Sequence, residues 1–252
     1  MKKNYGEYAA LILLLIMAAV AIIFEAVPIT YCTDKTKDAL LEDTVPRLIM
    51  GALLTVILIL LDGKRYLTPH NDLGQLVWCI PCLLVALANF PYSALISGAA
   101  TIQRADLIWL FLIKCLAIAV TEEVLFRGLL QRYIQDFFGH KKYGAIITVA
   151  VTSLIFGLFH LVNIKAGIGS TLLQVGYSFL IGAMLSAVIL KTENLYICIA
   201  LHFIFDIGGL IVPDLGTGAF QDAVFWVLTA VAGTVCFAHI LIYLLKKDNL
   251  LK

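Results

Sequence analysis

Apolar stretches long enough to cross a bilayer recur along almost the whole chain, and only short polar segments separate them. A helix needs about 20 mainly apolar residues to span the hydrocarbon core, so each stretch is a candidate membrane helix. We predict an all-α, polytopic membrane helix bundle of about eight transmembrane helices. The expected spans are 8–27, 46–61, 74–97, 107–131, 143–162, 169–190, 195–212 and 222–245.

Composition excludes a soluble enzyme and a disordered chain. Only 14% of the residues are charged and 62% are hydrophobic, whereas soluble domains carry about 25% charged residues. Disorder requires low hydrophobicity, which this chain lacks. The formal net charge of +1 gives no reason to expect a nucleic-acid partner. No repeat or linker divides the chain, so residues 1–252 are predicted to form a single integral-membrane domain.

The Lys and Arg residues between the spans predict the orientation of the bundle. With the N-terminus inside, eleven basic residues fall on the cytoplasmic side and five on the outer side, as the positive-inside rule expects. Both termini are therefore predicted to be cytoplasmic. The short chain with basic cytoplasmic loops favours a bacterial plasma membrane. The inner residues are Lys2, Lys3, Lys64, Arg65, Arg132, Lys141, Lys142, Lys191, Lys246, Lys247 and Lys252, and the outer ones Lys35, Lys37, Arg47, Arg104 and Lys165.

Proline and lysine positions add local expectations. The second span is expected to begin at Pro46, because proline suits the first turn of a helix, which leaves 31–47 as an outer loop. Pro81 and Pro91 are expected to kink the third span, as membrane helices tolerate. Lys114 lies toward the outer half of its span, and its ammonium group is expected to reach the interface.

Ionisable residues inside the spans are candidate functional residues, because each costs about 2.5–3.5 kcal/mol at the centre of a membrane helix. Glu123 and Arg127 are four residues apart, so they share a helical face and are expected to pair. Glu122 points about 100° away and is not neutralised by the same contact. We interpret Glu122 as an acid/base group facing a wet cavity. The alternative is a structural ion pair with a spare glutamate.

Two further clusters each contain a histidine. His160 follows Phe156 by four residues near the end of the fifth span, and Asn163 is placed to orient its imidazole. His202 and Asp206 are also four apart and share one face of the seventh span. The alternative for each histidine is a buried, hydrogen-bonded residue that packs helices together.

Depth in the membrane tests whether these groups can meet. Glu122 and His202 lie ten and eleven residues from the nearest cytoplasmic basic residue, roughly 15 Å deep at about 1.5 Å per residue. His160 lies eighteen residues from Lys142, the nearest cytoplasmic basic residue. It is therefore expected to lie deeper in the membrane unless its helix tilts or begins later.

The three clusters read E-E-x-x-x-R, F-x-x-x-H and H-x-x-x-D, in that order, within residues 105–212. This set resembles the CPBP (ABI) family of intramembrane proteases, which includes CAAX prenyl endopeptidases and bacteriocin-processing and bacteriocin-immunity proteins. The resemblance implies that 105–212 form the catalytic core. It also implies a CAAX-protease-like, glutamate-type intramembrane endopeptidase that acts within the lipid bilayer on a membrane-associated peptide or protein.

Peptide hydrolysis needs an activated water, a stabiliser for the oxyanion and a proton for the leaving amine. The resemblance implies that Glu122 and His160 activate the water. It implies that Glu123 and Arg127 support the site.

His202 and the residue at position 206 are implied to stabilise the oxyanion. This chain has Asp206 where other members have asparagine, and both are within the family pattern. An ionised carboxylate cannot donate to an oxyanion, whereas an amide can. Either Asp206 is protonated, or it acts by orienting His202, and we favour the second.

No cofactor is favoured, although a zinc alternative exists. Glu122, His160 and His202 would suit a zinc site with an open water position. The chain lacks H-E-x-x-H, which removes the usual argument for a zinc protease. We therefore favour a metal-free mechanism.

Two functions of other classes compete with proteolysis. The first is a non-proteolytic bacteriocin-immunity or peptide-binding membrane protein with the same fold. The second is a small transporter whose buried ionisable groups relay protons. A transporter would more often show paired halves, which this sequence does not contain.

Overall fold

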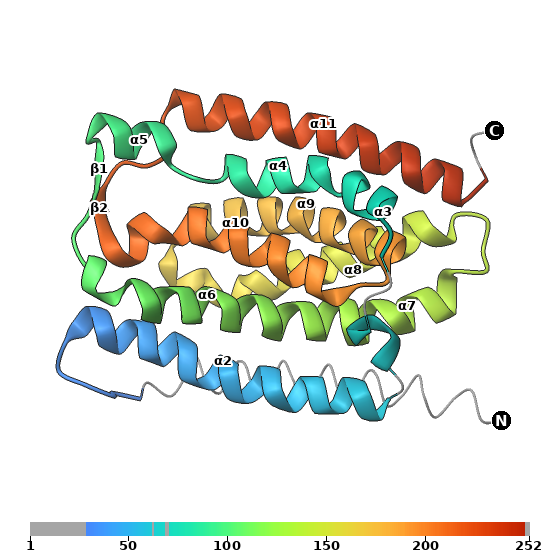
Figure 1. Ribbon diagram of the computed structural model, residues 1–252, viewed down its shortest axis with the longest axis horizontal. Helices are drawn as coiled ribbons and strands as arrows, with labels where there is room; N and C mark the ends of the chain where they lie inside the picture. The colour runs from blue at the N-terminus through green and yellow to red at the C-terminus, as the bar shows by residue number, and fades with distance from the viewer. Residues whose placement is uncertain (1–28, 62, 69–70, 250–252) are drawn as a thin grey trace.

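The computed structural model describes residues 29–61, 63–68 and 71–249, and the predicted span 8–27 lies outside them. The described chain is almost wholly helical, which confirms the all-α class. Its long helices run side by side along one axis, with α2 at one edge and α11 at the other (Figure 1). Six described segments are long and apolar enough to cross a membrane. The total of about eight spans and the cytoplasmic termini stay predictions.

The membrane-length segments are mostly single helices. They are α2 (Lys35–Leu60), α8 (Gly144–Phe159) with the 3-10 segment η4 (His160–Ala166), α9 (Ile168–Thr192), α10 (Leu195–Leu215), α11 (Ala223–Lys247), and the run α3 (Leu73–Trp78), α4 (Ile80–Ala88) and α5 (Tyr92–Ser97). The remaining elements are η1 (Lys64–Leu67), η2 (Ala105–Leu107), α6 (Ile108–Glu123), the π-helix η3 (Val124–Leu130), α7 (Gln131–Phe138) and two short strands, β1 (Ala100–Ile102) and β2 (Gly216–Gly218). The strands pair antiparallel at one end of the bundle (Figure 1).

Helix α2 begins eleven residues before the predicted start at Pro46. The Asp34 side chain accepts a hydrogen bond from a backbone N–H of the first turn, which caps the helix ahead of Lys35. Pro46 therefore lies inside the helix, and the predicted outer loop over 31–47 was wrong from residue 35 onward. Charged residues in this half of α2 lower its hydropathy, which is why the sequence pattern does not predict it as part of a span.

The third predicted span, 74–97, changes course at its two prolines. Pro81 lies in the first turn of α4, and Pro91 precedes the first residue of α5. Proline has no backbone N–H to donate and is therefore readily accepted where a helix begins. Near Pro81, Cys79 alone separates α3 from α4 and keeps a helical conformation, so the expectation of a kinked helix holds there. Near Pro91 the helix is interrupted rather than kinked, although the whole segment keeps the length and apolar composition of a membrane span.

The fourth predicted span, 107–131, is part of a longer helical segment that changes from α-helix to π-helix and back. Helix α6 passes directly into the π-helix η3 and then into α7, which ends at Phe138. A π-helix widens the turn and is found frequently at functional sites. Helix α6 alone has 16 residues and is not among the six described spans.

The length of α7 explains the depth of His160. Glu122 lies sixteen residues before Phe138, the last residue of α7, and His160 lies sixteen residues after Gly144, the first of α8. A short turn joins the two helices, so equal spacing brings the two side chains to one level. The expectation of a deeper His160 was wrong because Arg132 lies within α7 and does not mark its end.

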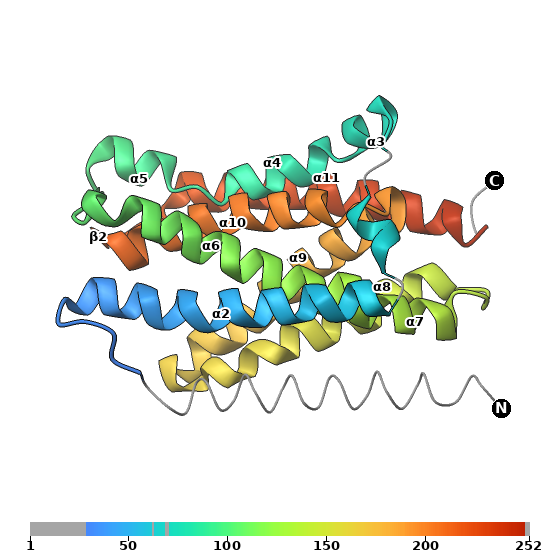
Figure 2. The same cartoon turned by 60° about the horizontal axis from the view of Figure 1, so that its bottom comes forward.

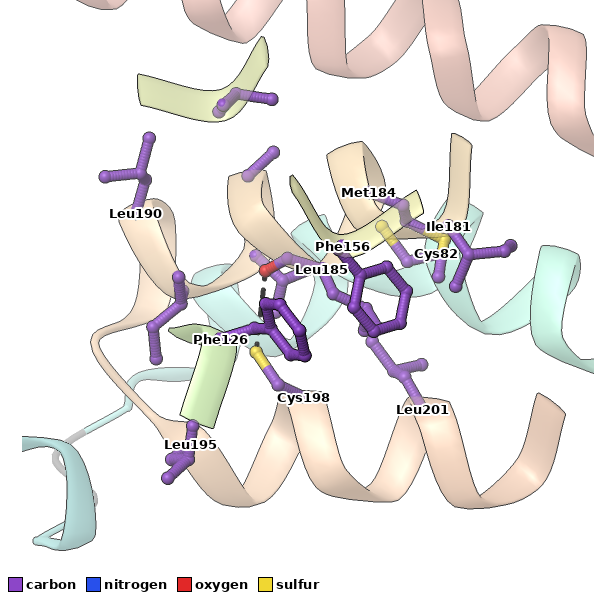
Figure 3. Close-up of a cluster of buried hydrophobic side chains, with 14 of the residues drawn as sticks. Cys82, Phe126, Phe156, Ile181, Met184, Leu185, Leu190, Leu195, Cys198 and Leu201 are labelled. Carbon is purple, nitrogen blue, oxygen red and sulfur yellow. Dashed lines mark hydrogen bonds between the residues drawn. The ribbon is translucent and has the colours of Figure 1, made fainter. Parts of the chain in front are cut away.

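The apolar core lies where η3, α8, α9 and α10 meet. Phe126 and Phe156 pack edge to face with ring centroids 4.9 Å apart, and Figure 3 shows them among Leu185, Leu201 and Cys198. In the turned view, α2 runs beside α6 along the outside of this core (Figure 2). The helices that carry the three sequence clusters thus surround one packed centre, and α2 covers one side of it.

Candidate active site

Glu123 and Arg127 form the expected ion pair at the junction of α6 and η3. Arg127 Nη1 lies 2.8 Å from Glu123 Oε1, and both side chains are 0% exposed. Arg127 Nη2 also donates to the Gly182 carbonyl, and the guanidinium carbon lies 4.4 Å from the centre of the Phe156 ring. The guanidinium is thus held by a carboxylate, a carbonyl and an aromatic face.

His202 joins this pair from α10. Its Nδ1 lies 2.7 Å from Glu123 Oε1, and the residue is buried. Its Nε2 lies 3.5 Å from Asp206 Oδ1 and 3.8 Å from Glu122 Oε2. The shortest contact indicates that Glu123 orients this imidazole, a role that the sequence predicts for Asp206. Among the described residues, Asp206 Oδ2 is a buried atom without a hydrogen-bond partner.

His160 is oriented by the backbone of its own helix. Its Nδ1 lies 2.9 Å from the Phe156 carbonyl oxygen. A carbonyl only accepts, so Nδ1 carries the hydrogen and Nε2 carries the lone pair of the neutral ring. The expectation that Asn163 orients the ring was wrong, because its amide instead donates to Gln174.

Glu122 and His160 line one cavity of about 380 Å³. Its wall also includes Phe126, Phe159 and six residues of α2, whereas His202 and Asp206 are not among the lining residues. The side chain of Glu122 therefore has the cavity on one side and the His202 imidazole on another. The lining residues of α2 are Ala39, Glu42, Asp43, Pro46, Arg47 and Met50.

Two glycines allow the helices around the cavity to approach closely. A Cβ atom on Gly157 of α8 would lie 2.9 Å from the Val175 carbonyl oxygen of α9. A Cβ atom on Gly51 of α2 would lie 2.9 Å from the Thr121 hydroxyl of α6. Both distances are shorter than real Cβ contacts, so a larger residue at either position would push the helices apart.

A second charge cluster, which the sequence reasoning missed, adjoins the cavity. Lys114 Nζ lies 2.7 Å from Asp43 Oδ2 and 2.9 Å from Asp214 Oδ2, and its side chain is 7% exposed. The ammonium group is therefore held inside the bundle by two carboxylates. Asp43 and Asp214 lay outside the predicted spans, so neither was considered as its partner. The signal available was Lys114 itself, because a lysine inside a span needs a partner.

The zinc alternative is not supported by the arrangement of its three ligands. In the part of the chain that the structure describes, no group of three or more His, Cys, Asp or Glu side chains is arranged to hold a metal ion. Glu122 and His160 line the cavity, whereas His202 is not among its lining residues. The metal-free mechanism stays a prediction.

A bundle of apolar helices with a glutamate and a histidine in the wall of one cavity defines a membrane-embedded acid/base site. Residues 104–208 match the model of the Rce1-like family, described as type II CAAX prenyl endopeptidase Rce1-like. This match supports the resemblance of residues 104–208 to CAAX-type intramembrane proteases, the family that the three clusters predicted. No similar curated protein and no similar solved structure was found.

The family match has consequences for the class of the protein. The matched residues include all three clusters, from Glu122 to Asp206. The match, together with the six apolar helices, supports an intramembrane endopeptidase of the CAAX type, an integral membrane protein in a lipid bilayer and a peptide or protein substrate.

Proposed function

We propose that the protein hydrolyses a peptide bond of a membrane-associated peptide or protein, with Glu122 and His160 as the groups that activate the water. The observation that carries this proposal is the shared cavity, because Glu122 and His160 come from different helices and line the same wall. The Glu122 carboxylate and the Nε2 atom of His160 are both proton acceptors. We place the protein in a bacterial plasma membrane, for which the short basic loops are the support.

The proposed reaction begins with a water molecule between the two acceptors. Glu122 takes a proton from the water while the water oxygen bonds to the scissile carbonyl carbon. The carbonyl oxygen then becomes an oxyanion. His160 accepts a hydrogen bond from the same water and orients it. The proton then passes from Glu122 to the amine nitrogen as the carbon–nitrogen bond breaks, which yields a carboxylic acid and an amine.

His202 is proposed to stabilise the oxyanion as an imidazolium, which donates its Nδ1–H to Glu123 and its Nε2–H to the oxyanion. Glu123 holds the opposite ring nitrogen, and Arg127 holds Glu123, so the imidazole is fixed before the substrate binds. Asp206 stands beside Nε2 and acts on the oxyanion through His202.

Cleavage by the purified protein in liposomes tests this proposal. The substrate is a library of quenched fluorescent peptides with apolar segments, read by fluorescence and by mass spectrometry of the products. Glu122→Gln and His160→Ala are expected to lower the rate by about 10²- to 10⁴-fold, the usual contribution of a general base. His202→Ala is expected to lower it by about 10²- to 10³-fold. His140→Ala is the matched control, because His140 is exposed and outside the cavity.

The same assay separates the alternatives. Full cleavage by Glu122→Gln would overturn the proposal, and binding of peptides without any cleavage would favour the non-proteolytic function. A chelator is expected to leave the rate unchanged. A loss of rate that zinc restores would replace the metal-free mechanism with a zinc one.

A further inference from the structure

The wall of the cavity supplied by α2 contains a guanidinium group. Arg47 lines the cavity together with Glu122 and His160. Its Nη1 donates to the Asp43 carboxylate at 2.7 Å and to the Asp43 carbonyl at 2.9 Å. Among the described residues, Nε and Nη2 of Arg47 have no hydrogen-bond partner. Arg47 therefore brings unused donors to the cavity that holds the proposed catalytic pair.

Lys114 fixes the position of this guanidinium from the buried side. Asp43 directs one oxygen to Arg47 and the other to Lys114, which also contacts Asp214. The Lys114 side chain is 7% exposed, whereas the Arg47 side chain is 35% exposed. The network is thus anchored in the bundle at Lys114 and ends in the cavity at Arg47.

The backbone of Arg47 is tied to the helix that carries Glu122. The Thr121 hydroxyl donates to the Arg47 carbonyl at 2.7 Å, and Gly51 allows α2 to lie close to α6 at this level. Thr121 directly precedes Glu122 in the chain. The guanidinium is therefore held at a set place relative to the proposed catalytic carboxylate.

The charges around the cavity indicate what the guanidinium binds. Arg47 and Lys114 are balanced by Asp43 and Asp214, so this network is neutral. Glu42 and Glu122 also line the cavity, and neither has a Lys or Arg partner among the described residues. A carboxylate ligand would add a third unbalanced negative charge. A neutral acceptor such as a peptide carbonyl would not, and carbonyls buried in a membrane need donors.

We propose that Arg47 is a substrate-binding residue that donates through Nη2 or Nε to a backbone carbonyl oxygen of the bound peptide, with Asp43 and Lys114 as positioning residues. This rests on the proposed function, because it requires a peptide in the cavity. It adds to that function a second fixed point on the substrate, separate from the reacting bond.

The test measures kcat and KM with the fluorescent peptide that the wild-type protein cleaves best. Arg47→Met is expected to raise KM about tenfold to a hundredfold, the effect of losing one hydrogen bond to a charged group, with kcat changed less than twofold. Arg47→Lys is expected to recover part of the loss. Arg132→Met is the matched control, because Arg132 lies outside the cavity lining.

Replacing single carbonyl oxygens of that peptide with sulfur locates the contact. Thioamide sulfur is a weaker acceptor, so one position is expected to raise KM for the wild-type protein and to have no further effect on Arg47→Met. Lys114→Met is expected to raise KM in the same way and to add nothing to Arg47→Met. If Lys114→Met does not fold, Lys114→Met/Asp214→Asn replaces it, since removing both groups leaves Arg47 and Asp43 balanced.

The outcomes distinguish this inference from the proposed function. Loss of cleavage in Glu122→Gln with an unchanged KM in Arg47→Met would overturn the inference and leave the proposed function standing. Additive effects of Lys114→Met and Arg47→Met would overturn the positioning role. A peptide with a free carboxylate that binds more tightly to the wild-type protein than its amide, and equally to Arg47→Met, would replace the carbonyl with a carboxylate as the ligand.

Discussion

Two charge clusters lie in the same helix bundle and differ in how they are enclosed. Arg127 and Glu123 come from one continuous helical path, and both side chains are 0% exposed. Lys114 joins residues of three helices, and its partners Asp43 and Asp214 are 38% and 17% exposed. The first cluster is closed to water, whereas the second reaches from the interior to the cavity.

This difference indicates different tasks. A charge without access to water must keep its partner, so the Glu123–Arg127 pair is suited to holding His202 in one position. A cluster that opens on a cavity can contact a bound molecule, as proposed for Arg47. Removing one member from each cluster therefore tests whether the more buried cluster contributes more to the free energy of unfolding.

The largest effect is expected from Arg127→Met. Glu123 would keep only His202 as a partner in a site without exposure, so the free energy of unfolding should fall by about 3–5 kcal/mol. Denaturation by dodecyl sulfate in mixed micelles, followed by circular dichroism, measures it. Glu123→Gln/Arg127→Met should recover part of the loss. Equal stability of Arg127→Met and the wild-type protein would show that the buried carboxylate finds another partner.

A smaller effect is expected from Lys114→Met. Water can reach the exposed parts of Asp43 and Asp214, so the loss in the same measurement should be about 1–3 kcal/mol. Lys114→Met/Asp214→Asn should lose less than the single variant, because it leaves one carboxylate fewer without a cation. A loss as large as that of Arg127→Met would mean that access to water does not reduce the cost of leaving Asp43 and Asp214 without Lys114.

The smallest effect is expected at Asp34, which provides an exposed reference for both clusters. The Arg104 side chain and the backbone N–H of Lys37 lower the pKa of Asp34 to about 2. A lowered pKa stabilises the fold above the ordinary value of 3.8, and this contribution is lost as the pH falls toward about 2. Asparagine also caps helices well, so Asp34→Asn keeps the cap and isolates the charge. The difference in denaturation midpoint between this variant and the wild-type protein should be small at pH 6 and shrink further at pH 3. A difference that grows on acidification would contradict the assignment.

The sequence predicted the first cluster far better than the second. The pairing of Glu123 with Arg127 follows from a spacing of four residues on one helix, and local spacing is read directly from a sequence. The contacts of Lys114 join residues 71 and 100 positions away, and such contacts depend on how helices pack. Hydropathy also placed Asp43 in a loop, although a capped helix begins at Lys35.

The histidines show the same division. His202 and Asp206 face each other as their spacing predicted, yet the shortest contact of His202 is to Glu123 on another helix. For His160, the orienting group is a backbone carbonyl. Every residue has a backbone carbonyl, so the sequence does not predict which one orients the ring. The family was predictable because its three motifs are local, whereas the α2 side of the cavity carries no motif.

If Glu122 and His160 act as proposed, their distance from the α7–α8 turn sets how much of a substrate that enters from this end precedes the cleaved bond. On the α8 side, sixteen residues separate His160 from that end, a length of about 24 Å at about 1.5 Å per residue. An extended peptide covers about 3.3–3.6 Å per residue, so a chain entering from this end must contribute about seven residues before one of its bonds reaches the pair. Lengthening α7 and α8 together by one turn would move the cut along such a substrate by one or two residues.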